Sequence, residues 1–316
     1  MDNQSASGGP SGIERRVAGG NVWLSRAGVD AREVVANLRV RPVPFEVLET
    51  EEAVGRAMLA EIESAAGRKQ GDLVVIILGG RGAQALHRQL GERAKTAELD
   101  ALLARLHVFT QDALAPMRMD NGFSFVRDFE RLLGPDFLRK VKSFNSMRTD
   151  VGDLEAGLTA YVERLESLGG VDIFFLGMGP EAGEASHLAY IKPGSGAAAA
   201  DVAGLIPISA SILEHHISKF KAGGSSVTEA DEAECRAATH ILTLGPATIL
   251  SARRVVQSIV DASTAPAKPA SYRRLRGEEL SDDPAERAAQ LDANPGLWLR
   301  LHDNVRSLVL PDVLAG

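Results

Sequence analysis

One segment of the sequence combines the residue types from which an active site can be built. An apolar run, residues 171–176, ends at the turn Gly177-Met178-Gly179, and the loop after it carries Glu181, Glu184 and His187. In an open α/β sheet, ligands bind just beyond the carboxyl ends of the strands. Glycines there let a substrate approach the backbone, and a histidine there can move protons near neutral pH. This segment is therefore the first candidate for catalysis.

A second candidate is the glycine-rich turn that follows the apolar run at residues 73–78. The turn reads Gly79-Gly80-Arg81-Gly82 and precedes a helical pattern. Backbone N–H groups at a helix N-terminus favour an anion, and the Arg81 guanidinium can add a charged fork. The alternative is a tight turn with a solvated arginine, because the turn matches neither of the common phosphate-binding glycine motifs.

Asp112 stands just after the expected strand at residues 106–110, where a carboxylate can act as a general base or cap a turn. His187 has no second histidine in its loop, which argues against a metal site. The pair His215-His216 lies in a helical pattern and is expected at the surface. Lys192 belongs to the sequence Ile-Lys-Pro-Gly-Ser and either forms a turn or binds an anion.

These segments are positioned by an alternation of strands and helices. The expected strands are residues 21–24, 45–48, 73–78, 106–110, 171–176, 205–209, 240–244 and 307–310, and the expected helices are residues 30–38, 51–66, 83–93, 123–133, 154–168, 247–260 and 282–291. The alternation predicts a doubly wound, Rossmann-like α/β fold with a mostly parallel sheet and helices on both faces. We expect residues 73–78, 106–110, 171–176 and 240–244 to share that sheet.

Composition limits the classes of protein that remain. The 316 residues carry a net charge of −7, which argues against a general nucleic-acid binder, and a single cysteine, Cys235, which excludes a disulfide framework. The chain has no apolar run near 18 residues and no signal-peptide pattern, so we expect a cytoplasmic protein without membrane contact. We expect a disordered tail at residues 1–20, an extension at 21–43 and one α/β domain at 44–316.

Several short motifs, taken in order, resemble those of the glucosamine-6-phosphate deaminase/isomerase and 6-phosphogluconolactonase superfamily over residues 44–312. They are Leu78-Gly79-Gly80-Arg81-Gly82, Phe109-Thr110-Gln111-Asp112, Ser124-Phe125-Val126-Arg127-Asp128-Phe129, Gly177-Met178-Gly179-Pro180-Glu181 followed by His187-Leu188-Ala189, Lys192-Pro193-Gly194-Ser195, Leu242-Thr243-Leu244-Gly245 and Leu299-Arg300-Leu301-His302. No single motif decides the resemblance, which rests on their shared order and spacing.

The resemblance implies an enzyme that acts on a phosphorylated sugar without a metal or organic cofactor. Asp112 would move a proton at the carbon that bears the amine, and His187, oriented by Glu181 or Glu184, would open the sugar ring. The aldose-to-ketose shift would then release ammonia. In a lactonase, His187 would instead activate water. The expected phosphate and substrate contacts are Gly79, Gly80, Arg81, Gly82, Gly179, Lys192 and Ser195, and a homo-oligomer is compatible with the family.

This sequence departs from the family pattern at several positions. Four extra residues separate Gly179 from His187, and Lys192 replaces the glutamate that supports ring opening. The hydroxyl-bearing phosphate loop becomes Gly-Gly-Arg-Gly, the usual arginine has no match near Ile212, and the usual late lysine falls near Thr264. Three hypotheses therefore stand: a deaminase/isomerase with an altered substrate, a 6-phosphogluconolactonase-like hydrolase, and a sugar-phosphate-binding protein without catalysis.

Overall fold

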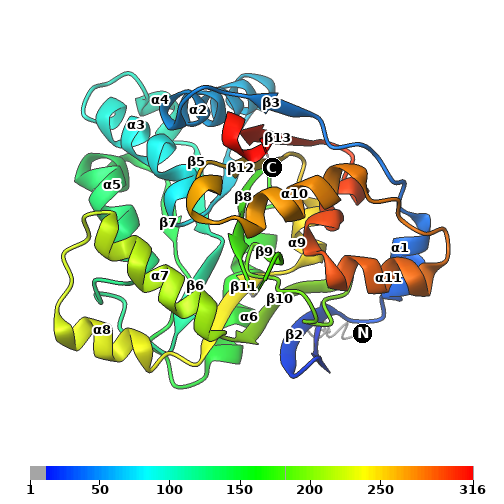
Figure 1. The fold of residues 1–316 in the computed structure, drawn as a ribbon. Helices are drawn as coiled ribbons and strands as arrows, with labels where there is room; N and C mark the ends of the chain where they lie inside the picture. The colour runs from blue at the N-terminus through cyan, green and yellow to red at the C-terminus, as the bar shows by residue number, and fades with distance from the viewer. Residues whose placement is uncertain (1–11, 182, 316) are drawn as a thin grey trace, which may run out of the picture.

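In the computed structural model, which describes residues 12–181 and 183–315, a parallel sheet of order β3-β13-β12-β8-β4-β5-β7 forms the centre of the molecule (Figure 1). Its strands are β3 (Phe45–Val47), β4 (Leu73–Ile77), β5 (Leu106–Thr110), β7 (Ser143–Asn145), β8 (Ile173–Pro180), β12 (Val255–Ile259) and β13 (Val305–Val309), and β9 (Ser186–Leu188) pairs antiparallel with the end of β8. The chain adds β5 and β7 on one side of β4 but β8, β12 and β13 on the other. The direction in which strands are added therefore reverses at β4. Open α/β sheets bind ligands in the crevice at such a point, outside the carboxyl ends of the strands.

The strands of this sheet are apolar on both sides because both faces are covered. In β4, Val74 and Ile76 belong to one apolar core, whereas Leu73, Val75 and Ile77 belong to the other. Successive side chains of a strand point to opposite faces of the sheet, so a strand in a sheet with both faces covered is apolar at every position. The predicted α/β fold with helices on both faces is confirmed.

Helices α2, α3, α5 and α7 contribute to the core that contains Val75, and α6, α9, α10 and α11 contribute to the core that contains Val74. The helices are α1 (Ala31–Asn37), α2 (Glu51–Arg68), α3 (Gln84–Ala94), α4 (Asp100–Leu103), α5 (Phe125–Lys140), α6 (Leu154–Glu166), α7 (Ala210–Ala222), α8 (Glu229–Arg236), α9 (Pro246–Ser251), α10 (Ala267–Gly277) and α11 (Pro284–Ala293), with 3-10 turns η1 (Arg81–Ala83), η2 (Ala262–Thr264), η3 (Pro295–Leu301) and η4 (Pro311–Val313). Among the described residues, no helix has the length and apolar character that a membrane crossing requires.

A second sheet, entirely antiparallel, corrects the prediction for residues 240–244. Its order is β1-β2-β10-β11-β6, with strands β1 (Ile13–Ala18), β2 (Asn21–Arg26), β10 (Asp201–Pro207), β11 (His240–Leu244) and β6 (Asp112–Ala115). The segment 240–244 is a strand, but it pairs with β10 and β6 instead of joining the parallel sheet. An apolar run predicts that a segment forms a strand. It does not predict which strands will pair with it, because the pairing depends on the path of the chain.

The N-terminal prediction also needs correction. Residues 13–18 form β1 instead of a disordered tail, and the expected tail at residues 1–11 lies outside the described residues. β1 and β2 form a hairpin through Gly19 and Gly20, whose φ angles of 57° and 76° suit a two-residue turn. The guanidinium of Arg16 pairs with the buried carboxylate of Asp201, which ties the hairpin to β10.

The helix predicted for residues 247–260 is two elements. Helix α9 ends at Ser251, and residues 255–259 form the buried strand β12 between β8 and β13. The β-branched residues Val255, Val256, Ile259 and Val260 favour a strand, but the apolar run before them hides the break. Helix α10 lies between the helices expected at residues 247–260 and 282–291, in a segment for which the sequence predicts no helix.

Candidate active site

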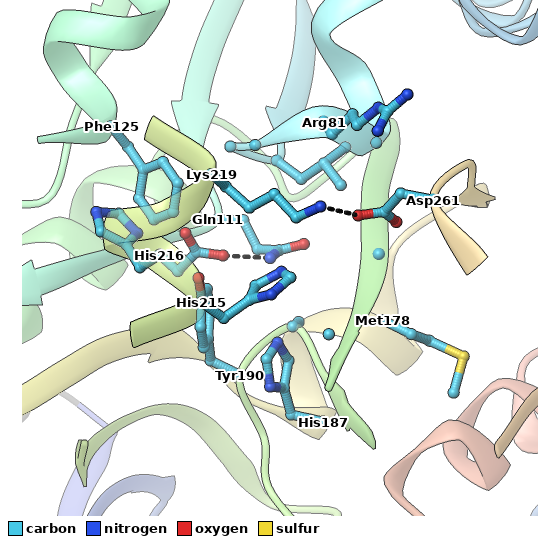
Figure 2. A pocket seen from close by; sticks show the side chains of 18 of the residues that line it. Arg81, Gln111, Phe125, Met178, His187, Tyr190, His215, His216, Lys219 and Asp261 are labelled. Atoms are coloured by element: carbon cyan, nitrogen blue, oxygen red, sulfur yellow. Dashed lines mark hydrogen bonds and ion pairs between the residues drawn. The ribbon is translucent and has the colours of Figure 1, made fainter. Parts of the chain in front are cut away.

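A cavity opens at the carboxyl ends of β4, β5, β8 and β12, where the chain order of the parallel sheet reverses (Figure 2). Seven of the residues proposed from sequence line it: Gly79, Gly80, Arg81, Gly82, Asp112, Gly179 and His187. Each follows a parallel strand, either directly or through a short hairpin. The fold therefore brings the glycine turn, the carboxyl group and the histidine to one place.

Asp112 is buried where the two sheets meet. Gln111 is the single residue between β5 and β6, and its side-chain amide donates a hydrogen bond to Oδ2 of Asp112. The other oxygen, Oδ1, is buried without a hydrogen-bond partner among the described residues. Burial raises the pKa of Asp112 to about 7, and the hydrogen bond from Gln111 offsets only part of this rise. A carboxyl group that titrates near neutrality can both accept and return a proton.

His187 lies opposite Gly179 on the hairpin formed by β8 and β9. Its Nδ1 is 3.1 Å from Oε1 of Glu181, whose Oε2 accepts a hydrogen bond from the Ser209 hydroxyl at 3.2 Å. A carboxylate at Nδ1 keeps the proton on that nitrogen and leaves Nε2 as an acceptor. Burial lowers the pKa of His187 despite the attraction of Glu181, so the imidazole is neutral at pH 7.

The extra residues before His187 belong to the connection between β8 and β9. The backbone N–H of Glu181 bonds to the carbonyl of Ala185 at 2.9 Å, which closes this connection, and His187 keeps its place in the β-ladder. The ring also stacks on Tyr190, with centroids 4.4 Å apart and planes at 19°. The insertion therefore leaves the histidine in the cavity.

Gly179 makes room for this imidazole. A methyl group at Gly179 would lie 2.1 Å from Nε2 of His187, while the backbone there is not in the left-handed region. We expect Gly179→Ala to fold but to displace the ring by about 1 Å, which lowers the turnover number on the order of 100-fold. Gly67→Ala is the control, because a methyl group there meets nothing within 4 Å. An unchanged turnover number and unchanged imidazole NMR signals in Gly179→Ala would contradict the assignment.

The glycine turn closes one end of the cavity. Gly80 has a φ of 72° and a ψ of −169°, a conformation that other residues rarely adopt. The chain then enters η1 and α3, an arrangement in which backbone N–H groups can bind an anion. The guanidinium of Arg81 is half-exposed and pairs with Glu51, at 2.6 Å from Nη2 to Oε1. Arg81 therefore lies at the rim of the cavity, where Glu51 competes with an anion.

Two lysines that the sequence did not single out stand nearer the cavity centre. Lys268 of α10 is buried and pairs with Asp261, which follows β12, and Lys219 of α7 is 3.7 Å from the same carboxylate. Figure 2 shows Lys219 extending across the cavity toward Asp261. Burial lowers the pKa of Lys268, and Asp261 opposes that change by favouring the ammonium. These lysines and the glycine turn form the cationic end of the cavity.

Four residues proposed from sequence do not line the cavity: Glu181, which contacts His187, and Glu184, Lys192 and Ser195, which lie apart from it. Glu184 is exposed, and its backbone carbonyl accepts a hydrogen bond from the Ser271 hydroxyl. Lys192 donates from Nζ to the backbone carbonyl of Pro207 at 2.8 Å, so no positive charge replaces the family glutamate inside the cavity. Ser195 is buried, and its carbonyl accepts hydrogen bonds from the side chains of Asn21 and Trp23. The substrate contacts expected of Glu184, Lys192 and Ser195 have no support from the cavity lining and stay predictions.

The histidine pair of α7 corrects another prediction, because both residues line the cavity instead of the surface. His216 is buried, its Nε2 is 2.7 Å from the Phe123 carbonyl, and its ring packs on Phe125 and Phe220. His215 is partly buried, and burial lowers its pKa to about 4, so it is a second neutral imidazole. Among the described residues, no three potential ligands gather in a way that could hold a metal ion.

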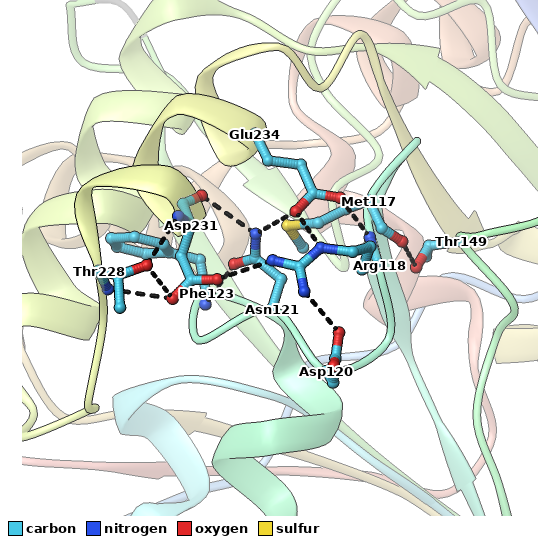
Figure 3. Close-up of polar contacts among 9 residues, drawn as sticks. All are labelled: Met117, Arg118, Asp120, Asn121, Phe123, Thr149, Thr228, Asp231 and Glu234. Atoms are coloured by element: carbon cyan, nitrogen blue, oxygen red, sulfur yellow. Dashed lines mark hydrogen bonds and ion pairs between the residues drawn. The ribbon is translucent and has the colours of Figure 1, made fainter.

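A polar network fixes the α7–α8 unit beside the cavity (Figure 3). The buried Asn121 donates to the Asp231 carbonyl at 3.0 Å and to Oε2 of Glu234 at 2.8 Å, and it accepts from the Phe123 N–H at 2.8 Å. Arg118 adds ion pairs to Asp231 and Glu234. The network joins the loop after β6 to α8, the helix that follows α7 in the chain and packs against it.

Solved structures with a similar fold are deaminases and lactonases of sugar phosphates. A monomeric glucosamine-6-phosphate deaminase matches with a TM-score of 0.63 and 19% identity, over 86% of this chain and 99% of that one. The 6-phosphogluconolactonases of Trypanosoma cruzi and Trypanosoma brucei match with TM-scores of 0.62 and 0.59 and identities of 14% and 19%, over 89% and 88% of this chain and 98% and 99% of theirs. No protein-family model and no curated protein sequence matches the chain. The resemblance seen in the sequence is thus confirmed at the level of the fold.

Proposed function

We propose that this chain is an enzyme that acts on a phosphorylated sugar, with aldose–ketose isomerisation and deamination of an amino sugar phosphate as its reaction. The observation that carries the proposal is that the buried Asp112, whose Oδ1 has no hydrogen-bond partner among the described residues, lines the same cavity as His187, which Glu181 orients. A proton-transfer carboxyl group and an oriented imidazole at one end, with cations at the other, fit a substrate that is reactive at one end and phosphorylated at the other.

In this proposal the phosphate binds to the backbone of Gly80 to Gly82 with Lys219 and Lys268. His187 takes the proton of the anomeric hydroxyl through Nε2 and returns it to the ring oxygen as the bond between that oxygen and carbon 1 breaks, which opens the ring to the aldehyde. Asp112 then removes the proton from carbon 2 and returns it to carbon 1, while a proton passes from the amine to oxygen 1, so that carbon 1 becomes an alcohol and carbon 2 an imine. The imine formed at carbon 2 adds water and expels ammonia, so that the oxygen of water becomes the ketone oxygen.

Hydrolysis of a 6-phospholactone is the second candidate. It is favoured by the Glu181–His187 pair, because an imidazole with a fixed tautomer can activate water as well as open a ring. It is also favoured by Lys192, which stands in the sequence where the resemblance expects the deaminase glutamate and which lies outside the cavity lining. Asp112 would then contribute binding but no proton transfer.

One experiment separates these functions. The protein is incubated with glucosamine 6-phosphate and with 6-phosphogluconolactone, while ammonia and acid release are followed, and binding of each sugar phosphate is measured by calorimetry. Ammonia from the amino sugar supports the deaminase, and acid from the lactone in excess of its spontaneous hydrolysis supports the lactonase. Binding without turnover would assign the chain to sugar-phosphate binding alone, and absence of binding would contradict the whole proposal.

A further inference from the structure

Gln111 occupies a position that fixes its side chain against the reactive carboxyl group. Its backbone N–H bonds to the Ile77 carbonyl at 2.9 Å, and its carbonyl accepts from the Leu244 N–H at 3.2 Å. It is therefore tied to the parallel sheet on one side and to the antiparallel sheet on the other. The residue is 4% exposed and lines the cavity next to Asp112.

The nitrogen and the oxygen of the Gln111 side-chain amide differ in their hydrogen bonding. Nε2 donates to Oδ2 of Asp112, whereas Oε1 is buried and has no hydrogen-bond partner among the described residues. Figure 2 shows the amide oxygen directed away from that hydrogen bond. Oδ1 of Asp112 is unpaired as well, so adjacent residues offer two unpaired oxygens in the same cavity wall. Buried acceptors are nearly always paired, and a site with two unpaired ones is suited to a ligand that brings donors.

We propose that Gln111 determines substrate specificity: its N–H positions Asp112, and its Oε1 accepts a hydrogen bond from an amino or hydroxyl group on the carbon that Asp112 deprotonates. The inference rests on the proposed function and narrows the substrate class. The substrate is a sugar phosphate with a hydrogen-bond donor at carbon 2. A 2-deoxy sugar phosphate leaves Oε1 of Gln111 unpaired and is rejected.

A purely structural role does not account for this geometry. The chain contains a second fully buried glutamine, Gln257 of β12, which does not line the cavity. Its Oε1 accepts a hydrogen bond from the Ser307 hydroxyl at 2.7 Å, so its carbonyl is satisfied within the fold, and its Nε2, away from the cavity, is the end without a partner among the described residues. Gln111 instead uses its donor within the protein and leaves its acceptor for a ligand. Gln257 is therefore the matched control for any general effect of losing a buried amide.

The specificity is tested by calorimetric titration with glucosamine 6-phosphate, glucose 6-phosphate and 2-deoxyglucose 6-phosphate. The wild-type protein should bind the 2-deoxy compound about 5- to 100-fold more weakly than the other two, because one buried acceptor is left unpaired. Gln111→Met keeps the length and lacks the acceptor, so it should bind all three within about twofold, whereas Gln257→Met should discriminate like the wild type. Discrimination that survives in Gln111→Met would overturn the specificity role.

The positioning role is tested without any ligand, by NMR titration of the Asp112 carboxyl carbon, assigned with Asp112→Asn. The N–H of Gln111 favours the ionised carboxyl group, so Gln111→Met should raise the Asp112 pKa, and Gln257→Met should leave it unchanged. Both variants leave the other titratable groups around the cavity in place. Those that line it are Arg81, His187, Tyr190, His215, His216, Lys219, Asp261 and Lys268, and Tyr161 lies close enough to Asp112 to interact with its charge. An unchanged Asp112 pKa in Gln111→Met would overturn the positioning role. If none of the three sugars binds the wild type, the proposed function and the specificity role fail together, and the titration alone decides the positioning role.

Discussion

Asp112→Asn should lower turnover by about 10²–10⁴-fold while leaving the affinity for the sugar phosphate nearly unchanged. The asparagine keeps the shape of the side chain and can still accept the hydrogen bond from Gln111, but it cannot take a proton. In the wild type, kcat/KM should rise about tenfold per pH unit up to the Asp112 pKa of about 7 and then level off, because only the ionised carboxyl group is a base. Initial rates between pH 5 and 9, with calorimetric binding at pH 7.5, check both statements.

The same substitution should stabilise the fold above neutral pH. The folded-state pKa of Asp112 is raised, so its contribution to stability is full below the unfolded-state pKa near 4 and is lost as the pH rises toward 7. Asp112→Asn removes this loss, and the free energy of unfolding at pH 8 should increase by about 1 kcal/mol or more, with little change at pH 4. Lower stability at both pH values, or turnover equal to that of the wild type, would show that Asp112 serves the fold instead of the reaction.

The sequence predicts those parts of the site that follow directly from a buried strand. The glycine turn after residues 73–78, Asp112 after residues 106–110 and Gly179 after residues 171–176 all come at the end of a strand that its apolar run identifies. Parallel strands end at one edge of a sheet, so these residues must converge. The cavity contains all of them.

The rest of the site depends on information that a single sequence lacks. Lys268 comes from a helix inside a charge-rich segment, and its role appears only through Asp261, which follows a strand that the pattern assigned to a helix. The adjacent histidines of α7 both line the cavity, and His216 also contacts the Phe123 carbonyl, a placement that depends on how α7 packs and not on its helical pattern. That Oε1 of Gln111 is buried without a partner among the described residues follows from the hydrogen bonds of the folded protein, which a sequence does not show.

Lys268→Met should weaken the binding of phosphate and of sugar phosphates about 10- to 150-fold, because a hydrogen bond from a charged group contributes about 1.5–3 kcal/mol. It should also lower the free energy of unfolding, since removal of one partner from a buried ion pair costs about 3–5 kcal/mol. The loss should fall at the lower end of that range, because Asp261 keeps Lys219 at 3.7 Å. Urea denaturation and calorimetric titration with inorganic phosphate and glucose 6-phosphate measure the two effects.

A double variant separates binding from folding. In Lys268→Met with Asp261→Asn, no uncompensated carboxylate remains buried, so most of the lost stability should return, whereas the phosphate affinity should stay low because the ammonium group is absent. Lys192→Met is the control for net charge: its ammonium bonds to Pro207 outside the cavity, so its removal should leave both measurements within error of the wild type. Recovery of phosphate affinity in the double variant, or an equal loss in Lys192→Met, would mean that Lys268 supports the fold and that the anion binds elsewhere. The comparison of Lys268 with Lys192 thus separates two candidate anion sites: the cavity that contains Lys268, and the loop around Lys192 that the family resemblance implies.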